Sequence, residues 1–239
     1  MSIQTRQLEY ADGDLVLEGL LAWDDAVEGP RPGVMVSHAW AGRTGFEDSI
    51  VVKLAELGYV GFALDLYSKG VRGSNKEENA ALMQPFLDDR EMLQKRLLLS
   101  LNTMREQAEV DAENVAAIGY CFGGLSVLDI ARTGEDLAGV ASFHGILVPP
   151  GNLEGNTITA KVLVLHGWDD PMAPPEHFVA LAEELTAMGA DWQMHAYGNT
   201  LHAFAKPGTD DPTIGALYSE KADRRSWAAT QDFLAELFA

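Results

Sequence analysis

Short apolar segments alternate with longer amphipathic ones along most of this chain, and the alternation limits the folds that it can adopt. Apolar runs such as VLVLHG (162–167) are typical of strands buried on both faces of a parallel sheet, and the amphipathic segments are typical of helices that cover those faces. Further strands are expected at 33–38, 59–67, 115–119, 140–143 and 192–196, and helices at 47–57, 91–108, from Phe122 onward, at 175–188 and at about 220–238. The sequence therefore predicts an α/β fold with a mostly parallel central sheet.

The start of the chain follows a different pattern. Two β-like runs, 4–10 and 15–23, flank the turn-forming residues 11–14, which predicts an antiparallel hairpin. With this hairpin at one edge, the expected sheet has about eight strands and carries helices on both faces.

No linker or internal repeat interrupts the sequence, and its prolines and glycines are spread through the connections. Residues 1–239 are therefore expected to form one domain. The polar segment 70–90 follows the carboxyl end of a strand, and its portion 79–86 has helical character. This segment is a candidate partial cap over a site.

Composition excludes several classes of function. The chain has 17 Lys and Arg against 36 Asp and Glu, a net charge of −19, which argues against nucleic-acid binding because phosphates need compensating cations. It contains no run of about 18 apolar residues, so no membrane span is expected, and the opening MSIQTRQLEY has no secretory signal pattern. The one cysteine has no partner for an intrachain disulfide, and we expect a cytoplasmic protein.

That cysteine stands in the motif AIGYCFGG (117–124), between an apolar strand and a predicted helix. Ligands of parallel α/β sheets bind beyond the carboxyl ends of the strands, which is where Cys121 lies. Gly119 and Gly123 have no Cβ atom, so the strand and the helix can approach closely. The pattern is that of a G-x-S-x-G nucleophile elbow in which sulfur replaces oxygen. The helix N-terminus favours the thiolate, and the backbone N–H of Phe122 is a candidate oxyanion donor.

A thiolate nucleophile requires a base, and that base requires an orienting acid. In this fold the chain order is nucleophile, acid, histidine. His195 falls inside a predicted strand, whereas His202 follows it in the loop GNTLHAF, so we favour His202 as the base. The acid is expected after strand 162–166, where Asp170 is preferred and Asp169 is the alternative.

The remaining histidines and polar groups suggest no further chemistry. His38, His144 and His166 also stand at strand ends, and we interpret them as hydrogen-bonded supports of loops. No cluster has the spacing of a metal site, and no phosphate-binding loop or dinucleotide fingerprint is present, so neither metal nor cofactor is expected.

Several of these motifs together resemble the dienelactone hydrolases of the α/β-hydrolase superfamily. The resemblance covers most of the chain from Gly33 onward and rests on VMVSHAWAG, ELGYVGFALDLYSKG, AIGYCFGG, VLVLHGWDDPMAPP and YGNTLHAF. It implies an α/β-hydrolase fold with Cys121, Asp170 and His202 as a Cys-Asp-His triad. It also implies an oxyanion hole made by the backbone N–H groups of Phe122 and Trp40.

The chain departs from the dienelactone pattern at two places. Family members commonly carry a glutamate directly after the first motif's histidine, which is thought to control the charge of the cysteine, and here that position is Ala39. The dienelactone enzymes also hold the substrate carboxylate with two arginines. One of these positions is Lys206 here, and the segment 74–89 contains no arginine. Lysine lacks the bidentate fork of arginine, which argues against dienelactone itself as the substrate.

We therefore expect a cysteine hydrolase of small esters or lactones that acts through an acyl-enzyme thioester. Its partner would be a small-molecule substrate, and the chain would be a monomer or a homodimer. Two alternatives stay open: an acyltransferase that uses the same triad, and a non-catalytic ligand-binding protein on a hydrolase scaffold. Candidates for the substrate pocket are Tyr67, His144, Met172 and Lys206, together with Trp40 and Phe122.

Overall fold

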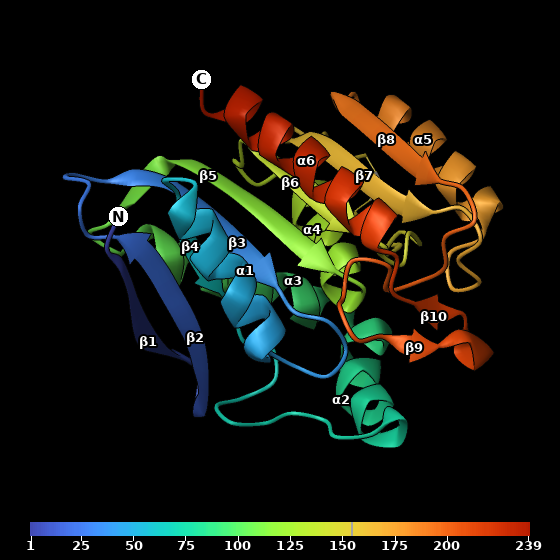
Figure 1. The fold of residues 1–239 in the computed structure, drawn as a ribbon, viewed down its shortest axis with the longest axis horizontal. Coiled ribbons are helices and arrows are strands. Elements are labelled where there is room, and N and C mark those ends of the chain that lie inside the picture. The colour runs from blue at the N-terminus through green and yellow to red at the C-terminus, as the bar shows by residue number, and fades with distance from the viewer. Residues whose placement is uncertain (154) are drawn as a thin grey trace. The chain divides into compact units, whose positions relative to one another are not determined.

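The computed structural model describes residues 1–153 and 155–239, and the chain divides into two compact units, Met1–Ala117 and Ile118–Ala239. Eight strands form one sheet in the order β1-β2-β4-β3-β5-β6-β7-β8 (Figure 1). Strand β5 (Val110–Tyr120) begins in the first unit and ends in the second. The sheet is mostly parallel with an antiparallel N-terminal edge, which confirms the predicted fold class. The expectation of one domain over 1–239 stays a prediction.

The strands of the first unit establish that antiparallel edge. β1 (Ile3–Asp12) and β2 (Leu15–Asp24) form the expected hairpin, with Ile3 opposite Asp24. β2 also runs antiparallel to β4 (Val60–Ala63), and β4 runs parallel to β3 (Arg31–Ser37). β4 is completely buried, as its uninterrupted apolar sequence predicts.

Three helices accompany these strands. α1 (Gly45–Glu56) begins at a capping box in which Thr44 and Glu47 bond each other's backbone N–H groups, and it packs on β2, β3 and β4. α2 (Lys76–Asp88) contacts α3 (Arg90–Arg105), which contacts β1 and β3. In Figure 1, α1 lies in front of the strands of this unit and α3 behind them.

The second unit continues the parallel sheet. β6 (Gly139–Phe143), β7 (Lys161–Gly167) and β8 (Trp192–Tyr197) pair in parallel, so their carboxyl ends lie at the same edge. Beyond β8 the chain forms the short antiparallel pair β9 (Asp210–Asp211) and β10 (Ala216–Leu217), joined by the 3-10 helix η1 (Pro212–Ile214).

Three helices also cover the sheet of the second unit. α4 (Phe122–Arg132) packs on β6, α5 (Pro175–Ala187) on β8, and α6 (Glu220–Leu237) on β6 and β7. Arg132 joins α4 to α5, because its buried guanidinium donates to both carboxylate oxygens of Glu184, at 2.7 and 2.8 Å, and to Asp129 at 3.1 Å. A buried guanidinium needs hydrogen-bond acceptors for its N–H groups, because a buried charged donor without a partner is unfavourable.

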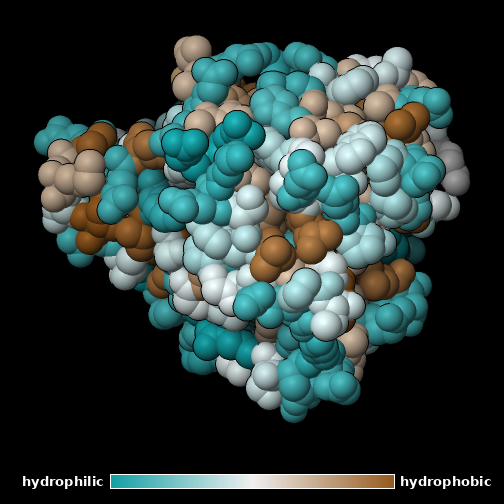
Figure 2. All heavy atoms as spheres, turned by 45° about the vertical axis from the view of Figure 1, so that its right-hand side comes forward, coloured by the Kyte–Doolittle hydropathy of each residue, from teal (hydrophilic) through white to brown (hydrophobic). Residues whose placement is uncertain are grey.

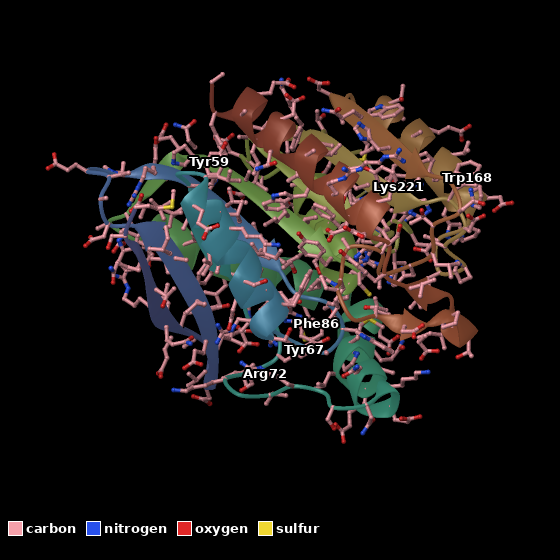
Figure 3. All side chains as sticks on the ribbon, in the orientation of Figure 1. Tyr59, Tyr67, Arg72, Phe86, Trp168 and Lys221 are labelled. Atoms are coloured by element: carbon pink, nitrogen blue, oxygen red, sulfur yellow. The ribbon has the colours of Figure 1, made fainter. Side chains whose placement is uncertain are left out.

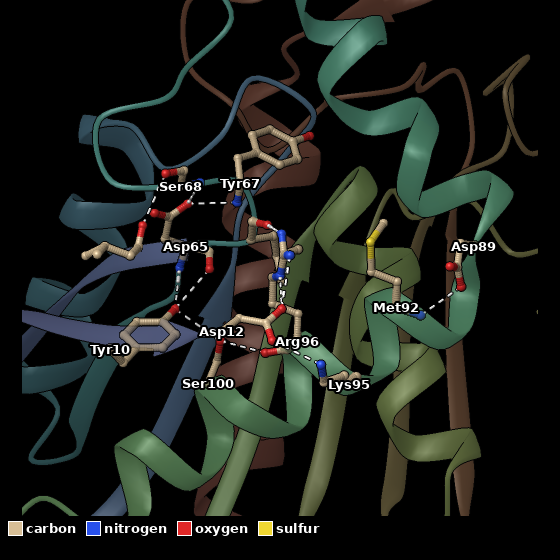
Figure 4. A network of polar contacts seen from close by, with 12 residues as sticks. Tyr10, Asp12, Asp65, Tyr67, Ser68, Asp89, Met92, Lys95, Arg96 and Ser100 are labelled. Carbon is tan, nitrogen blue, oxygen red and sulfur yellow. Dashed lines mark hydrogen bonds and ion pairs between the residues drawn. The ribbon is translucent and has the colours of Figure 1, made fainter. Parts of the chain in front are cut away.

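Most expected elements are present, and the differences have local causes. β4 ends at Ala63 rather than near Tyr67, because the Asp65 carboxylate accepts the backbone N–H groups of Tyr67 (2.9 Å) and Ser68 (3.2 Å) and turns the chain (Figure 4). The hydroxyl of Tyr10 donates to the Asp65 carbonyl at 3.0 Å and stabilises the same turn. The helix in 70–90 is longer than expected, since Asn75 caps it at Lys76. The sequence analysis did not predict β9, η1 or β10.

The surface agrees with the acidic composition. Figure 2 shows a face that is mostly hydrophilic, with apolar side chains in small separate groups. Among the described residues, every helix is too short or too polar to cross a membrane.

Candidate active site

The turn between β5 and α4 holds Cys121 in a strained backbone conformation, with φ 58° and ψ −113°. Gly119 permits this turn, because a Cβ atom there would lie 2.0 Å from the carbonyl oxygen of Gly123. Gly124 is equally constrained, since its Cβ would lie 2.7 Å from the Cα of Gly145. These are the backbone features of a nucleophile elbow.

The backbone of Cys121 is fixed on both sides. Its N–H donates to the carbonyl of Phe143 at 3.0 Å, and its carbonyl accepts the N–H of Leu125 at 3.2 Å. The cysteine is partly exposed, whereas Phe122, which begins α4, is buried. As the N-cap residue of an eleven-residue helix, Cys121 lies at the positive end of the helix dipole, which favours a thiolate over a thiol.

Asp170 and His202 are brought together from the ends of two other strands. Nδ1 of His202 lies 2.7 Å from Oδ2 of Asp170, and both side chains are buried. The second carboxylate oxygen, Oδ1, accepts the N–H of Met172 at 2.8 Å. The carboxylate therefore fixes the orientation of the imidazole and leaves Nε2 for chemistry.

The alternative candidates occupy other positions. Asp169 uses Oδ2 to accept the backbone N–H of Thr200 at 3.1 Å, so it holds the loop before His202 rather than its ring. His195 lies within β8, where it pairs with Leu165 of β7.

The electrostatic surroundings of His202 favour its protonated form. Burial by itself lowers the pKa of the imidazole, but the charge of Cys121 and the hydrogen bond to Asp170 outweigh it and raise the pKa to about 10. Nε2 is buried and has no hydrogen bond of standard geometry in the described part of the chain. In its thiolate form Cys121 raises the pKa of the ring mainly through its charge and to a smaller extent through direct contact, and an imidazolium is then favoured at neutral pH.

Two further buried histidines accompany His202. The ring of His144 lies edge-on to that of His202, with centroids 5.0 Å apart, and the ring of His166 stacks on Phe178 at 5.3 Å. Among the described residues, neither ring has a hydrogen bond of standard geometry. The interpretation as a hydrogen-bonded loop support is therefore wrong for His144, whereas for His166, on whose pKa burial and a contact with the backbone of Ala173 act in opposite directions, it stays a prediction. Burial lowers the pKa of both, and that of His144 lies well below its usual value.

The loop after β3 in the first unit contains Trp40, the other expected oxyanion residue. His38 does support this loop, since Nδ1 bonds the carbonyl of Ala39 at 2.7 Å and Nε2 accepts the N–H of Leu66 at 3.1 Å. The hydroxyl of Tyr67 donates to the carbonyl of Trp40 at 2.9 Å. Tyr67 is therefore buried against the loop backbone.

Glu47 also contacts this loop, and the sequence analysis missed its role. The Ala39 N–H lies 3.3 Å from the Oε1 of Glu47, whose side chain is buried although it comes from α1. A buried carboxylate thus lies beside the position where dienelactone enzymes carry glutamate. The T-x-x-E capping pattern of Thr44 and Glu47 is the sequence signal that points to it.

Of the other predicted pocket residues, Met172 is half-buried beside the acid, and Lys206 is close enough for its charge to act on the ring of His144. In the described ranges, no three His, Cys, Asp or Glu side chains are arranged to hold a metal ion.

A strained residue at a strand-to-helix turn, with an acid after β7 and a histidine after β8, defines an α/β-hydrolase. The family model of the dienelactone hydrolase family matches residues 17–238, and this chain belongs to that family. Like the rest of the family, it is a hydrolase.

Three relatives show how far the likeness extends. A dienelactone hydrolase-like promiscuous phosphotriesterase from metagenomic libraries is 34% identical and superposes with a TM-score of 0.94 over the whole of both chains. An uncharacterized protein of Caenorhabditis elegans is 35% identical over 62% of this chain and 95% of its own length. A probable 2-oxo-3-(5-oxofuran-2-ylidene)propanoate lactonase of Bradyrhizobium sp is 24% identical over 98% of this chain and 96% of its own.

Proposed function

We propose that this chain hydrolyses small carboxylic esters or lactones with Cys121 as the nucleophile. The observation that carries the proposal is the 2.7 Å contact between Asp170 and His202, in the same unit as the strained elbow of Cys121. The position of Cys121 at the positive end of the α4 dipole and the hydrogen bond between Asp170 and His202 support a resting thiolate and imidazolium.

In the first half of the reaction, the Cys121 sulfur attacks the carbonyl carbon, a C–S bond forms, and the carbonyl electron pair moves to oxygen. The N–H groups of Phe122 and Trp40 are the proposed donors to that oxyanion. When the tetrahedral adduct collapses, the C–O bond to the leaving group breaks, and the alkoxide takes a proton from Nε2 of His202. A thioester and an alcohol result.

In the second half, neutral His202 removes a proton from water while Asp170 stabilises the imidazolium that forms. Hydroxide attacks the thioester, the C–S bond breaks, and the thiolate returns with the imidazolium. The net change is ester plus water to acid plus alcohol. A lactone gives both groups in one product molecule.

Activated acyl groups suit this mechanism better than amides, because the tetrahedral adduct of an amide expels the thiolate in preference to the nitrogen and so returns to the substrate. The similarity to a lactonase agrees with a lactone substrate. The likeness to a phosphotriesterase over the full chain favours a second candidate activity, attack of the same thiolate on an activated phosphotriester. We also propose the cytoplasm as the site of action, because a lone reactive thiol requires a reducing compartment.

The test is hydrolysis of aryl acetates, simple lactones and an aryl phosphotriester by the wild type, Cys121→Ala and Cys121→Ser. Cys121→Ala is expected to lose at least about 10³-fold in kcat/KM on every substrate that the wild type cleaves. Cys121→Ala with wild-type esterase activity would contradict the proposal. Acyl transfer to an added alcohol in preference to water would indicate the acyltransferase, and no turnover of any substrate would indicate the ligand-binding protein.

A further inference from the structure

Strand β10 and the residue before it hold the backbone of His202 through both its N–H and its carbonyl. The N–H of His202 donates to the carbonyl of Gly215 at 2.9 Å, and the carbonyl of His202 accepts the N–H of Leu217 at 3.0 Å. Ala216 lies directly opposite His202 as an isolated parallel bridge. A histidine in a loop therefore has the backbone restraint of a strand residue.

Gly215 also meets the residue that follows the acid. A Cβ atom on Gly215 would lie 2.1 Å from Cγ and 2.6 Å from Cδ of Pro171. Pro171 is bonded to Asp170, whose carboxylate orients His202. Gly215 thus contacts both partners of the Asp170–His202 pair. Its carbonyl accepts the N–H of His202, and its Cα lies against the ring of Pro171, the residue after Asp170.

The conformation of Gly215 makes this contact possible. Gly215 has φ 75° and ψ 25°, in the left-handed region that favours glycine, and it ends η1 with its N–H bonded to the carbonyl of Pro212 at 3.1 Å. Two hydrogen bonds join the ends of the segment 204–219: the N–H of Tyr218 donates to the carbonyl of Thr209 at 2.9 Å, and the N–H of Ser219 donates to the carbonyl of Phe204 at 3.0 Å. Such a closed segment transmits any displacement of Gly215 to His202.

We propose that Gly215 is a positioning residue that sets the distance between Asp170 and His202. This role rests on the proposed function, since it acts through that pair. A methyl group at this position would push apart Gly215 and Pro171, and with them the histidine and the acid. A misplacement of about 1 Å in such a pair lowers turnover by up to about a hundredfold.

The experiment compares Gly215→Ala with Gly208→Ala. Gly208 has a similar positive φ, 83°, but a Cβ there would meet nothing within 4 Å. Both variants place a side chain at a similar positive φ, and only Gly215→Ala adds the collision with Pro171. We expect Gly215→Ala to lower kcat for an aryl ester at least about tenfold below Gly208→Ala, with KM changed less than about twofold.

Recovery of kcat in a double variant provides a second test, which a purely structural role of Gly215 would not pass. In the double variant Pro171→Ala with Gly215→Ala, the atoms that collide are absent, and kcat should return to within about threefold of Pro171→Ala alone. With an alkyl ester, whose alkoxide needs a proton from His202, the fall in kcat/KM at high pH should begin at lower pH in Gly215→Ala and return in the double variant, because the hydrogen bond to Asp170 helps to keep His202 protonated.

If Gly215→Ala does not fold, Pro171→Ala is compared with Pro207→Ala, an exposed proline near the start of the segment. Pro171→Ala should lower kcat about threefold while Pro207→Ala leaves it unchanged. Equal kcat for Gly215→Ala and Gly208→Ala, with Cys121→Ala inactive, would overturn the positioning role alone. Full activity of Cys121→Ala would instead overturn the proposed function.

Discussion

His38 and His144 are both buried histidines that directly follow a strand, β3 in the first unit and β6 in the second. Both ring nitrogens of His38 are hydrogen-bonded, to the carbonyl of Ala39 and the N–H of Leu66. Neither ring nitrogen of His144 has a bond of standard geometry among the described residues. Burial lowers the pKa of both rings, so both are neutral at physiological pH.

The difference shows where this fold accepts unfavourable contacts. A buried polar atom without a partner costs about 1–3 kcal/mol, and His144 also has a positive φ of 38°. It lies beside His202, in the same unit as the strained Cys121, whereas both ring nitrogens of His38 are hydrogen-bonded. Strain and an unsatisfied ring thus coincide where chemistry is expected.

The largest effect is expected at the two neighbouring aspartates. Asp170→Asn should lower kcat about 10³-fold or more, because the amide no longer stabilises the imidazolium or fixes its tautomer. Asp169→Asn should lower kcat less than about threefold, since an amide oxygen still accepts the N–H of Thr200. Steady-state kinetics on one aryl ester measures both variants. The opposite ranking would move the acid to Asp169.

The pH dependence should follow the protonation of His202. Its raised pKa, about 10, means that the imidazolium is present at neutral pH and is lost as the pH rises. For an alkyl ester, whose alkoxide needs a proton, kcat/KM should fall about tenfold per pH unit above this value. An aryl ester, whose phenolate leaves unprotonated, should show no such fall.

Asp170→Asn tests whether His202 is the group whose loss of a proton causes this fall in kcat/KM. Loss of the carboxylate removes one of the groups that raise the pKa of His202, so the fall should begin at lower pH. A fall that begins at the same pH, or one that both ester types show, would mean that another group titrates.

Replacement by phenylalanine should affect the two buried histidines to different extents. His38→Phe leaves the N–H of Leu66 without its partner and should lower the free energy of unfolding by about 2–4 kcal/mol. His144→Phe removes polar atoms that have no partner and should change it by less than about 1 kcal/mol. Urea unfolding monitored by far-UV circular dichroism measures both. Similar losses for the two variants would remove the basis of the comparison.

The sequence could predict the elements that carry the proposed triad because each has a strong local signal. Cys121 is marked by glycines at a strand-to-helix turn, and the chain order after two apolar strands points to Asp170 and His202. The structure brings the side chains of Asp170 and His202 into contact. The hairpin and the parallel strands were predictable for the same reason, since their hydrophobic periodicity is local.

What the sequence could not predict depends on contacts between distant residues. β9, η1 and β10 are too short for any periodicity, so the close approach of Gly215 to Pro171 is visible only in coordinates. His38 and His144 have the same sequence context, a histidine after an apolar strand, and only the fold decides which is hydrogen-bonded. The early end of β4 likewise follows from the turn around Asp65.

The smallest effect is expected at Tyr67, which the sequence placed in the substrate pocket. Its ring packs on Phe86 at 5.7 Å (Figure 3) and on His38 at 4.8 Å, and its hydroxyl donates to the carbonyl of Trp40. Tyr67→Phe removes that one hydrogen bond and should lower the free energy of unfolding by about 1 kcal/mol with KM unchanged.

Tyr218→Phe is the matched control for Tyr67→Phe, because it also removes a single hydroxyl, one that donates to Asp223 at 3.0 Å on a more exposed part of the chain. It should cost less stability, since the groups that it leaves unpaired are hydrated. A several-fold rise in KM confined to Tyr67→Phe would instead show that the hydroxyl reaches the substrate. The loop around His38 would then take part in binding. The contrast between His38, whose ring is hydrogen-bonded and structural, and His144, whose unbonded ring lies beside His202, would no longer hold.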